Sequence, residues 1–427
     1  MSLAEVYDRP VARRLVPPQP PRAPDDMSFL KRMRMMRHSA IATWTQRAYE
    51  EDVIEGNFFG RSSFILNTPD AIKHVLVDNW ENYTRTPTGF RVLRPMLGQG
   101  LLIAEGRAWK HQRRTLAPAF TPRAVSMLVP HMIDVIDETV AALKTRGHAP
   151  VDLRETMQRM TLEVAGRTMF SFGMERHGAA LRNFVMEYAD DLARPHLLDI
   201  ALPLWFKTPQ DFRRARFRKR WTAFIATLMA HRRAAGKQEG APPRDLFELM
   251  EAARDPETGK AFTDSQLGDE VATEANNASA ALDAERLKFT RAVIDETLRL
   301  YPSAFLVARA AYAPDIVAGR KIKAHDVILM APWILHRHER LWQEPNAFLP
   351  QRFMAPNPPP ERFAYLPFGA GPRVCIGAHF AQVEATLALA KLIGAFRVEL
   401  VDKMPVIPTG VVTTQPDRSP QFVIEPR

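Results

Sequence analysis

The chain contains one cysteine, Cys375, in surroundings that favour metal chemistry. It lies in the segment Phe368–Gly377, where three of the ten residues are glycine. A helix beginning at the cysteine would direct free backbone N–H groups at the sulfur and stabilise a thiolate, the form that binds metals. Gly371 and Gly377 would let the backbone approach a flat cofactor closely, and Arg373 could reach an anionic edge of it.

The alternative for Cys375 is a structural residue buried in the core, which is the more common place for a lone cysteine. Because the sequence has no second cysteine, an intramolecular disulfide, an iron–sulfur cluster and an all-cysteine zinc site are excluded. The neighbouring residues decide between a metal ligand and a core residue.

The ten-residue segment has the pattern Phe-x-x-Gly-x-Arg-x-Cys-x-Gly, with Phe368, Gly371, Arg373, Cys375 and Gly377 at the specified positions. This pattern resembles the haem-binding signature of the cytochrome P450 family, in its soluble bacterial type. The resemblance covers nearly everything from about Phe58 to Val423. It implies haem b (iron protoporphyrin IX) as cofactor, with Cys375 as the ligand of the iron.

Two more segments resemble parts of the family that support the cysteine. Glu296-Thr-Leu-Arg299 matches a Glu-x-x-Arg pattern, and on a helix its charged side chains share one face and can pair. Alone, such a pattern is more often an ordinary surface pair. The segment Pro345–Phe353 resembles the one whose arginine, here Arg352, completes a Glu-Arg-Arg network. The resemblance implies that these residues brace the cysteine loop and are not catalysts.

Further residues resemble positions at which the family binds haem propionates. Trp109 and Arg113 match a Trp-x-x-x-Arg pattern, and one helical turn separates them, so both can face one cofactor edge. Arg309 matches another such position, and Arg373 of the cysteine segment joins this group. For Trp109 the alternative is core packing. None of the twelve histidines is expected as an axial ligand; His336 and His338 are expected on a buried turn.

The apolar pattern predicts a mainly α fold with a minor β region, and the resemblance implies the single-domain form of the P450 family. Residues 1–57, which include a proline-rich stretch, should pack on or lead into a body formed by residues 58–427. Helical stripes dominate residues 108–240, and strands are expected at about 310–335. A helix should follow Cys375.

The composition constrains the partners. The formal charge of +10 at pH 7 favours acidic ones. The densest basic run, residues 213–221, is interpreted as the solvated face of a helix, because no nucleic-acid motif accompanies it. One cysteine fits a reducing compartment, and we find no leader or stretch that could span a bilayer. We therefore expect a cytoplasmic monomer without a membrane anchor or a nucleic-acid partner. Its electrons should come from a separate acidic ferredoxin or flavodoxin with a reductase.

The sequence departs from the family in the long helix that crosses the distal haem face. That helix carries an Ala/Gly-Gly-x-Asp/Glu-Thr element, in which an acid and an alcohol help to deliver protons. Here a helix begins near Phe262, but only 27 positions (296 minus 269) separate Asp269 from Glu296. At about 1.5 Å per helical residue, the roughly 40 residues that are missing exceed the width of the cofactor. Neither Thr273 with Glu274 nor Asp269 with Thr273 matches the expected pair.

The resemblance implies a haem-thiolate monooxygenase that inserts one oxygen atom of O₂ into a small apolar organic substrate. Because the distal helix is incomplete, we expect an impaired or inactive enzyme. The alternatives are a non-catalytic haem-binding protein and a peroxide-driven haem enzyme. The residues that match pocket-lining segments of the family, and that could equally belong to the core, are Phe90, Phe305, Leu306, Val307 and Val412.

Overall fold

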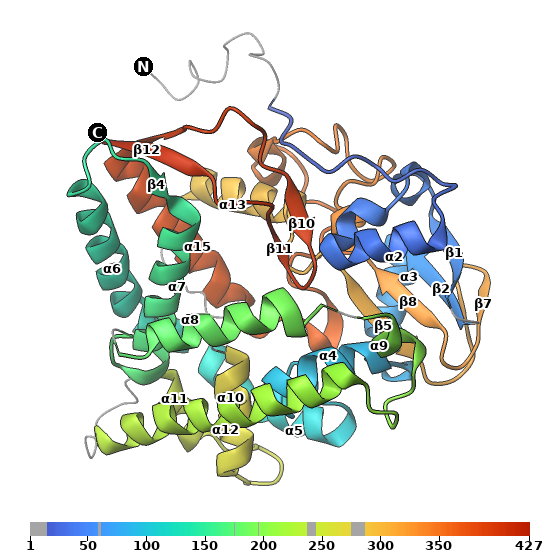
Figure 1. The fold of residues 1–427 in the computed structure, drawn as a ribbon, viewed down its shortest axis with the longest axis horizontal. Helices are drawn as coiled ribbons and strands as arrows, with labels where there is room; N and C mark the ends of the chain where they lie inside the picture. The colour runs from blue at the N-terminus through green and yellow to red at the C-terminus, as the bar shows by residue number, and fades with distance from the viewer. Residues whose placement is uncertain (1–14, 59–60, 175, 195, 237–244, 275–286) are drawn as a thin grey trace.

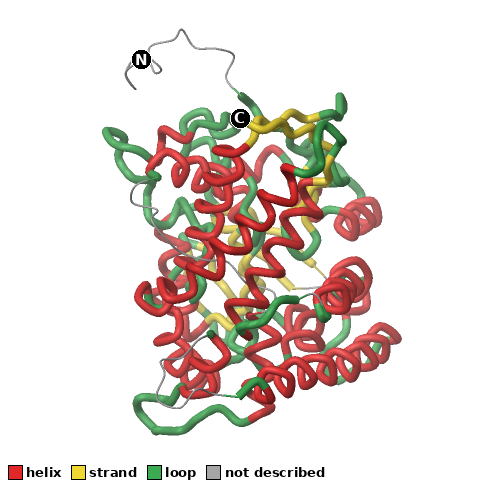
Figure 2. Tube along the Cα trace, turned by 90° about the vertical axis from the view of Figure 1, so that its left-hand side faces the viewer, coloured by secondary structure: helices red, strands yellow, loops and turns green. Residues whose placement is uncertain are grey.

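The computed structural model describes residues 15–58, 61–174, 176–194, 196–236, 245–274 and 287–427. Helices make up most of the molecule, and the strands gather in smaller regions among and beside them (Figures 1 and 2). This arrangement confirms the predicted mainly α class with a minor β part. Among the described residues, none of the helices combines the length and the apolar character that crossing a bilayer requires.

The helices follow the chain from one end to the other. They are α2 (Phe29–His38), α3 (Pro69–Lys73), α4 (Pro87–Leu97), α5 (Gly106–Leu116), α6 (Pro122–Lys144), α7 (Leu153–Phe170), α8 (Gly178–Glu187), α9 (Leu197–Ala201), α10 (Pro209–Ala234), α11 (Leu246–Ala252), α12 (Asp264–Glu274), α13 (Lys288–Leu300), α14 (Pro332–Leu335) and α15 (Ala378–Ala395).

The strands form one larger sheet and three small ones. They are β1 (Val53–Phe58), β2 (Arg61–Leu66), β3 (Tyr83–Thr84), β4 (Val151–Asp152), β5 (Val307–Ala311), β6 (Asp315–Val317), β7 (Arg320–Ile322), β8 (Val327–Met330), β9 (Phe396–Leu400), β10 (Pro408–Gly410), β11 (Thr414–Pro416) and β12 (Gln421–Pro426). The larger sheet has the order β1-β2-β8-β5-β3, in which only β2 and β8 run parallel. The others are β4-β12-β9, β10-β11 and β6-β7.

The largest core lies among the helices and includes the central stripe of α6. This helix begins at a cap, because the Thr121 hydroxyl accepts a hydrogen bond from the N–H of Ala124 at 3.3 Å. Met132, Val135 and Ile136, which recur at helical spacing, are all buried in that core. The periodicity therefore identified both the helix and the face that it buries.

Glu296 and Arg299 lie one turn apart on α13 and are both fully buried. Arg299 donates to both carboxylate oxygens, from Nε to Oε2 at 2.7 Å and from Nη2 to Oε1 at 2.8 Å. The same Oε1 accepts hydrogen bonds from Nε of Arg352 at 3.1 Å and from the backbone N–H of Leu349 at 2.7 Å. These four bonds offset the cost of burying an ion, so a Glu-Arg-Arg network of the expected kind is present.

His336 connects this network to the cysteine segment. Its Nδ1 lies 3.0 Å from the carbonyl oxygen of Arg299, and its Nε2 lies 2.8 Å from the backbone nitrogen of Leu366. Because a carbonyl only accepts and an amide N–H only donates, the imidazole is neutral and carries its proton on Nδ1. Leu366 stands two residues before Phe368, where the cysteine segment starts. His336 and His338 both lie buried just after α14, as predicted.

The buried imidazole makes folding stability depend on pH. Burial lowers the pKa of His336 from 6.5 to about 3, so the folded state stays unprotonated where the unfolded chain takes up a proton. As the pH falls from 6.5 toward 3, this residue alone should remove about 1.4 kcal/mol of unfolding free energy per pH unit. His336→Gln should be less stable at pH 7 by about 1–3 kcal/mol, yet lose stability less steeply in acid.

Urea unfolding at several pH values between 7 and 4 would measure both effects. His148→Gln is the matched control, because the His148 side chain is 81% exposed. This variant should have the stability and the pH dependence of the wild type. A His336→Gln protein with the wild-type pH slope would contradict the assigned neutral imidazole.

Candidate functional site

The cysteine segment folds into a closed turn that presents the side chain of Cys375. The backbone N–H of Val374 donates to the Gly371 carbonyl at 3.0 Å, and that of Cys375 donates to the Phe368 carbonyl at 2.9 Å. The Cys375 side chain is exposed, so the interpretation as a buried core cysteine is wrong. Helix α15 begins at Ala378, three residues after the cysteine, rather than at the cysteine itself.

The two glycines of the segment have different surroundings. Gly371 has a φ of +71°, and a Cβ there would lie 2.0 Å from the carbonyl oxygen of Leu76. Any side chain would push the cysteine turn away from the segment after α3, so the packing of protein on protein requires this glycine. A Cβ on Gly377 would meet nothing within 4 Å, so space is open beside it.

Arg373 is held on three sides beside the cysteine turn. Its Nη1 donates to the Ala104 carbonyl at 3.1 Å, its Nη2 contacts the Glu105 carboxylate, and its guanidinium lies 4.6 Å from the centre of a Trp109 ring. Its Nε is buried without a hydrogen-bond partner among the described residues. A buried donor of this kind is costly unless an acceptor is supplied from outside the chain.

Arg309 and Arg85 complete a cluster of half-buried cations. Burial, together with the nearby charges of Arg85 and Arg373, lowers the pKa of Arg309 to about 9. Burial likewise lowers the pKa of Arg373 to about 10, with Arg85 as the next cause. All three guanidiniums therefore remain charged at pH 7. Glu105 Oε1 accepts a hydrogen bond from Arg85 Nη1 at 3.0 Å. The negative charge of Glu105 also raises the pKa values of Arg309 and Arg373, against the effect of burial.

This cluster fits the anionic edge of a haem. Three guanidiniums facing one carboxylate leave an excess of two positive charges, and the two propionates of a haem carry two negative ones. The buried Nε of Arg373 adds a donor that awaits an acceptor. Arg373, Arg309 and Arg85 would hold the propionates, Trp109 would pack beside them, and Cys375 would ligate the iron.

Arg113 lies on the cysteine side of this arrangement. Its Nη1 donates to the carbonyl of Val374 at 2.8 Å, directly before the cysteine. Burial lowers the pKa of Arg113, whereas the charge of Cys375 raises it, so guanidinium and sulfur are electrostatic neighbours. In this structure Arg113 thus contacts the cysteine turn, whereas the sequence predicted a propionate contact. Trp109 is 6% exposed and belongs to the core cluster, so its predicted alternative of core packing also holds.

The apolar residues proposed to line the pocket are dispersed. Phe305 is 4% exposed and packs in a small core with Ile41 and Trp333, so it is a core residue. Phe90 lines a surface cleft beside α10, and Val412 is 40% exposed. Leu306 and Val307 are half-buried. The structure does not bring these five residues together around one cavity that it describes.

On the distal side, the acids of α12 serve a structural purpose. Asp269 accepts from the backbone N–H of Gln99 at 2.8 Å and from Arg218 at 2.9 Å, and Glu270 accepts from the N–H of Leu101 at 2.9 Å. Both acids therefore hold the turn after α4, which leads toward Glu105. The segment 275–286, which lies within the predicted gap between Asp269 and Glu296, is outside the described residues.

Sequence reasoning missed Arg85 and Glu105, and it placed His336 on a buried turn without finding its link between the Glu296 network and Leu366. No motif contains them, and each acquires its place only because distant segments meet.

Comparisons with known proteins agree with this geometry. A family model described as Cytochrome P450 matches residues 17–279 and 269–422. Cyclooctat-9-en-7-ol 5-monooxygenase of Streptomyces melanosporofaciens is 27% identical over 391 residues, covering 82% of this chain and 83% of that protein. Cyclooctatin synthase of the same organism is 28% identical, covering 81% and 83%.

More distant similarities point the same way. The chloroplastic protein LUTEIN DEFICIENT 5 of Arabidopsis thaliana is 26% identical, covering 81% of this chain and 67% of that one. The crystal structure of the cytochrome P450DA heme domain superposes with a TM-score of 0.75 and 20% identity, covering 97% of this chain and 98% of that one. At that identity, the structural likeness speaks for the fold.

The position of Glu105 leads to a test of the cation cluster. The Glu105 carboxylate binds guanidiniums to which a haem propionate would also bind, so Glu105 and the propionate should compete for them. Glu105→Gln should lower the melting temperature of the haem-free protein, because three cations then lack their counter-ion. The same change should slow haem loss about tenfold, since the propionates meet more positive charge.

Calorimetry of the haem-free protein and transfer of haem to apomyoglobin, followed by absorbance, would measure the two effects. Glu81→Gln is the control, because Glu81 is 65% exposed and pairs with Lys110 at the surface. Unchanged or faster haem loss from Glu105→Gln would show that Glu105 is purely structural.

Proposed function

This chain belongs to the cytochrome P450 family, whose cofactor is a haem with cysteine-ligated iron, and we propose that Cys375 is that ligand in a monooxygenase of reduced competence. The observation that carries the proposal is the exposed cysteine turn beside an excess of half-buried arginine charge. Cys375 is the sole cysteine of the sequence, so no other residue could supply a thiolate.

The cysteine turn, Arg113 and the cation cluster each have a separate role in this proposal. The closed turn between Phe368 and Cys375 fixes the direction of the sulfur, and Arg113 holds the turn through the Val374 carbonyl. The cation cluster orients the cofactor by its propionates. When bound, the haem supplies the redox chemistry by which one atom of O₂ enters an organic substrate while the other is reduced to water.

The proposed substrate is a small apolar organic molecule. The names of several relatives support this class, since one acts on cyclooctat-9-en-7-ol and another, of Arabidopsis thaliana, is a carotene epsilon-monooxygenase. The proposed electron donor is a separate acidic ferredoxin or flavodoxin, supported by the net charge of +10. That the protein is a cytoplasmic monomer, divided into residues 1–57 and a single domain of residues 58–427, stays a prediction.

We further propose that the distal helix is shortened by an internal deletion. The described part of helix α12 spans 11 residues, about 16 Å of helix. The family model matches in two segments that meet within residues 269–279, which supports a break at this place. The alignment with the first Streptomyces relative is 391 positions long, but it covers only 82% of this 427-residue chain, or about 350 residues. The relative therefore has stretches that this chain lacks.

Haem ligation is tested by spectroscopy. The reduced protein with carbon monoxide should show the red-shifted Soret band of a thiolate-ligated haem, because Cys375 supplies the only thiolate. Cys375→Ala should abolish that band while the far-ultraviolet circular dichroism is retained. A persisting band in Cys375→Ala would disprove the ligand, and well-folded protein that takes up no haem would disprove the proposal.

Impairment is tested by accounting for electrons. With a surrogate ferredoxin and reductase, most of the reductant consumed should be recovered as hydrogen peroxide, because the acid–alcohol pair that delivers protons has no counterpart among the described residues. Reductant, peroxide and hydroxylated product would be measured together, with cyclic terpenoid alcohols and carotenes offered as substrates. Product formation that accounts for most of the reductant would contradict the impairment. Turnover with added peroxide alone would favour the peroxide-driven alternative, and neither activity would favour a haem-binding protein.

A further inference from the structure

A surface cleft of about 620 Å³ lies between α4 and α10, which pack together (Figure 1). One wall comes from α4 and the turn after it, and the other comes from α10 and the loop before it. Small-molecule sites in proteins have volumes of roughly 300–1,000 Å³, so the cleft has the size of such a site. The residues assigned above to the propionates and to the cysteine turn are not among those that line it.

Buried polar contacts fix both walls of the cleft. Arg91 of α4, whose side chain is 3% exposed, donates to carbonyls of the loop before α10, including those of Leu202 at 3.0 Å and Phe206 at 2.8 Å. At the start of α10, Thr208 and Asp211 form a capping box through bonds of 2.9 and 3.3 Å. A ligand that enters preformed walls does not have to order them, which favours its affinity.

Asp211 lines the cleft, and the cations on either side of it compensate its charge. Nε of Arg91 and Nη1 of Arg214 each lie 3.5 Å from the Asp211 carboxylate. Arg214 also donates to both carboxylate oxygens of the buried Asp199, at 2.8 and 2.9 Å. These two arginines and two acids therefore balance one another.

The remaining cations of the lining leave an excess of positive charge. Arg218 donates to Asp269 at 2.9 Å, so it is paired as well. Arg94 and Lys207 are exposed, and neither takes part in an ion pair with another residue that the structure describes. Five lining cations thus face three acids, and the two charges left over come one from each wall.

Apolar side chains line the same cleft. Phe90 and Pro95 of α4 belong to one wall, and Leu204 and Ala215 belong to the other. Leu204 is 44% exposed, so it offers apolar surface that the fold leaves uncovered. A cleft with apolar walls and two uncompensated cations suits a ligand that has an apolar body and an anionic head.

We propose that the cleft between α4 and α10 binds a small molecule that carries an apolar chain and the dianionic head of a phosphate monoester. Arg94 and Lys207 bind the phosphate oxygens, and Phe90 and Leu204 contact the chain. This binding site is additional to the proposed monooxygenase chemistry and does not rest on it, because the residues assigned to the haem lie outside the cleft.

Isothermal titration calorimetry of the purified full-length protein with octyl phosphate tests the proposal. At pH 8 this probe carries two negative charges, because the second pKa of a phosphate is about 6. Octyl sulfate, with one charge, and octanol, with none, have the same chain. Octyl phosphate should bind one molecule per chain and about tenfold more tightly than octyl sulfate, and added salt should weaken its binding. The preference for two charges also distinguishes a phosphate monoester from a lipid phosphodiester, which carries one.

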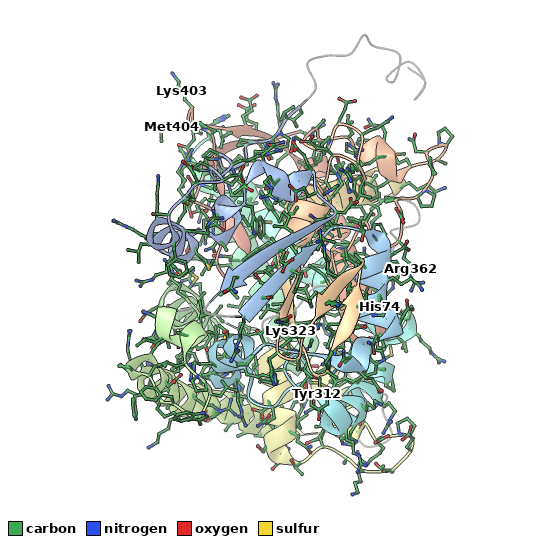
Figure 3. All side chains as sticks on the ribbon, turned by 90° about the vertical axis from the view of Figure 1, so that its right-hand side faces the viewer. His74, Tyr312, Lys323, Arg362, Lys403 and Met404 are labelled. Carbon is green, nitrogen blue, oxygen red and sulfur yellow. The ribbon has the colours of Figure 1, made fainter. Side chains whose placement is uncertain are left out.

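Arg94→Gln and Lys207→Gln should each weaken the binding of octyl phosphate about tenfold, because each removes one charge-assisted hydrogen bond. Arg94→Lys keeps the charge and should retain most of the affinity. Arg362→Gln and Lys403→Gln are the matched controls, since both residues are exposed and Figure 3 shows them away from α10. All of these side chains lie at the surface, so the melting temperature should stay that of the wild type.

Each outcome decides the proposal. No binding of octyl phosphate, equal binding of octanol, or an equal loss of affinity in the control variants would overturn it. In haem-loaded protein, octyl phosphate should leave the Soret band unchanged. A Soret shift that persists in Arg94→Gln would place the ligand beside the haem and also overturn the proposal. A failure to bind haem would contradict the proposed function alone, because the calorimetric titration needs no haem.

Discussion

The buried carboxylate of Glu296 is the interaction on which the proximal half of the molecule depends. It fixes α13 to the segment around Arg352 and Leu349, and through Arg299 it reaches the carbonyls of His336 and Ala347. His336 in turn accepts a hydrogen bond from the backbone N–H of Leu366, which lies just before the cysteine turn. A buried ion pair contributes little net stability, but removing one partner leaves an uncompensated charge. The network is therefore better understood as a device that permits one geometry of the cysteine turn than as a source of stability.

The cation cluster has the opposite character, because it is incomplete without a ligand. Arg85 lies close enough to lower the pKa of both Arg309 and Arg373, Arg373 also lowers the pKa of Arg309, and Glu105 raises both pKa values. Like charges held together in a half-buried place cost free energy in the empty protein, and an anionic cofactor edge removes that cost. The site is thus preorganised for a dianion, and cofactor binding and folding stability are coupled by the same charges.

The sequence could predict the residues that belong to short motifs, but not those whose roles depend on partners far along the chain. Cys375, Arg373, Trp109 and Glu296 belong to short motifs, and local spacing is enough to place them. Glu105 and His336 act through partners far along the chain, and no local pattern marks such a partner. For Gly371 the sequence predicts a place beside the cofactor, and the structure adds a second reason for glycine, because the Leu76 carbonyl leaves no room for a Cβ.

The described part of α12 explains how a shortened distal helix can coexist with an ordered proximal side. Leu267 and Val271 of this helix are buried in the largest core, while Asp269 and Glu270 hold the turn that follows α4. That turn continues into Ala104 and Glu105, which bind Arg373. The first turns of the distal helix therefore carry the contacts that shape the propionate side. Residues that a longer helix would add lie beyond these contacts, so the proposed deletion would remove distal chemistry while leaving the contacts of the propionate side in place.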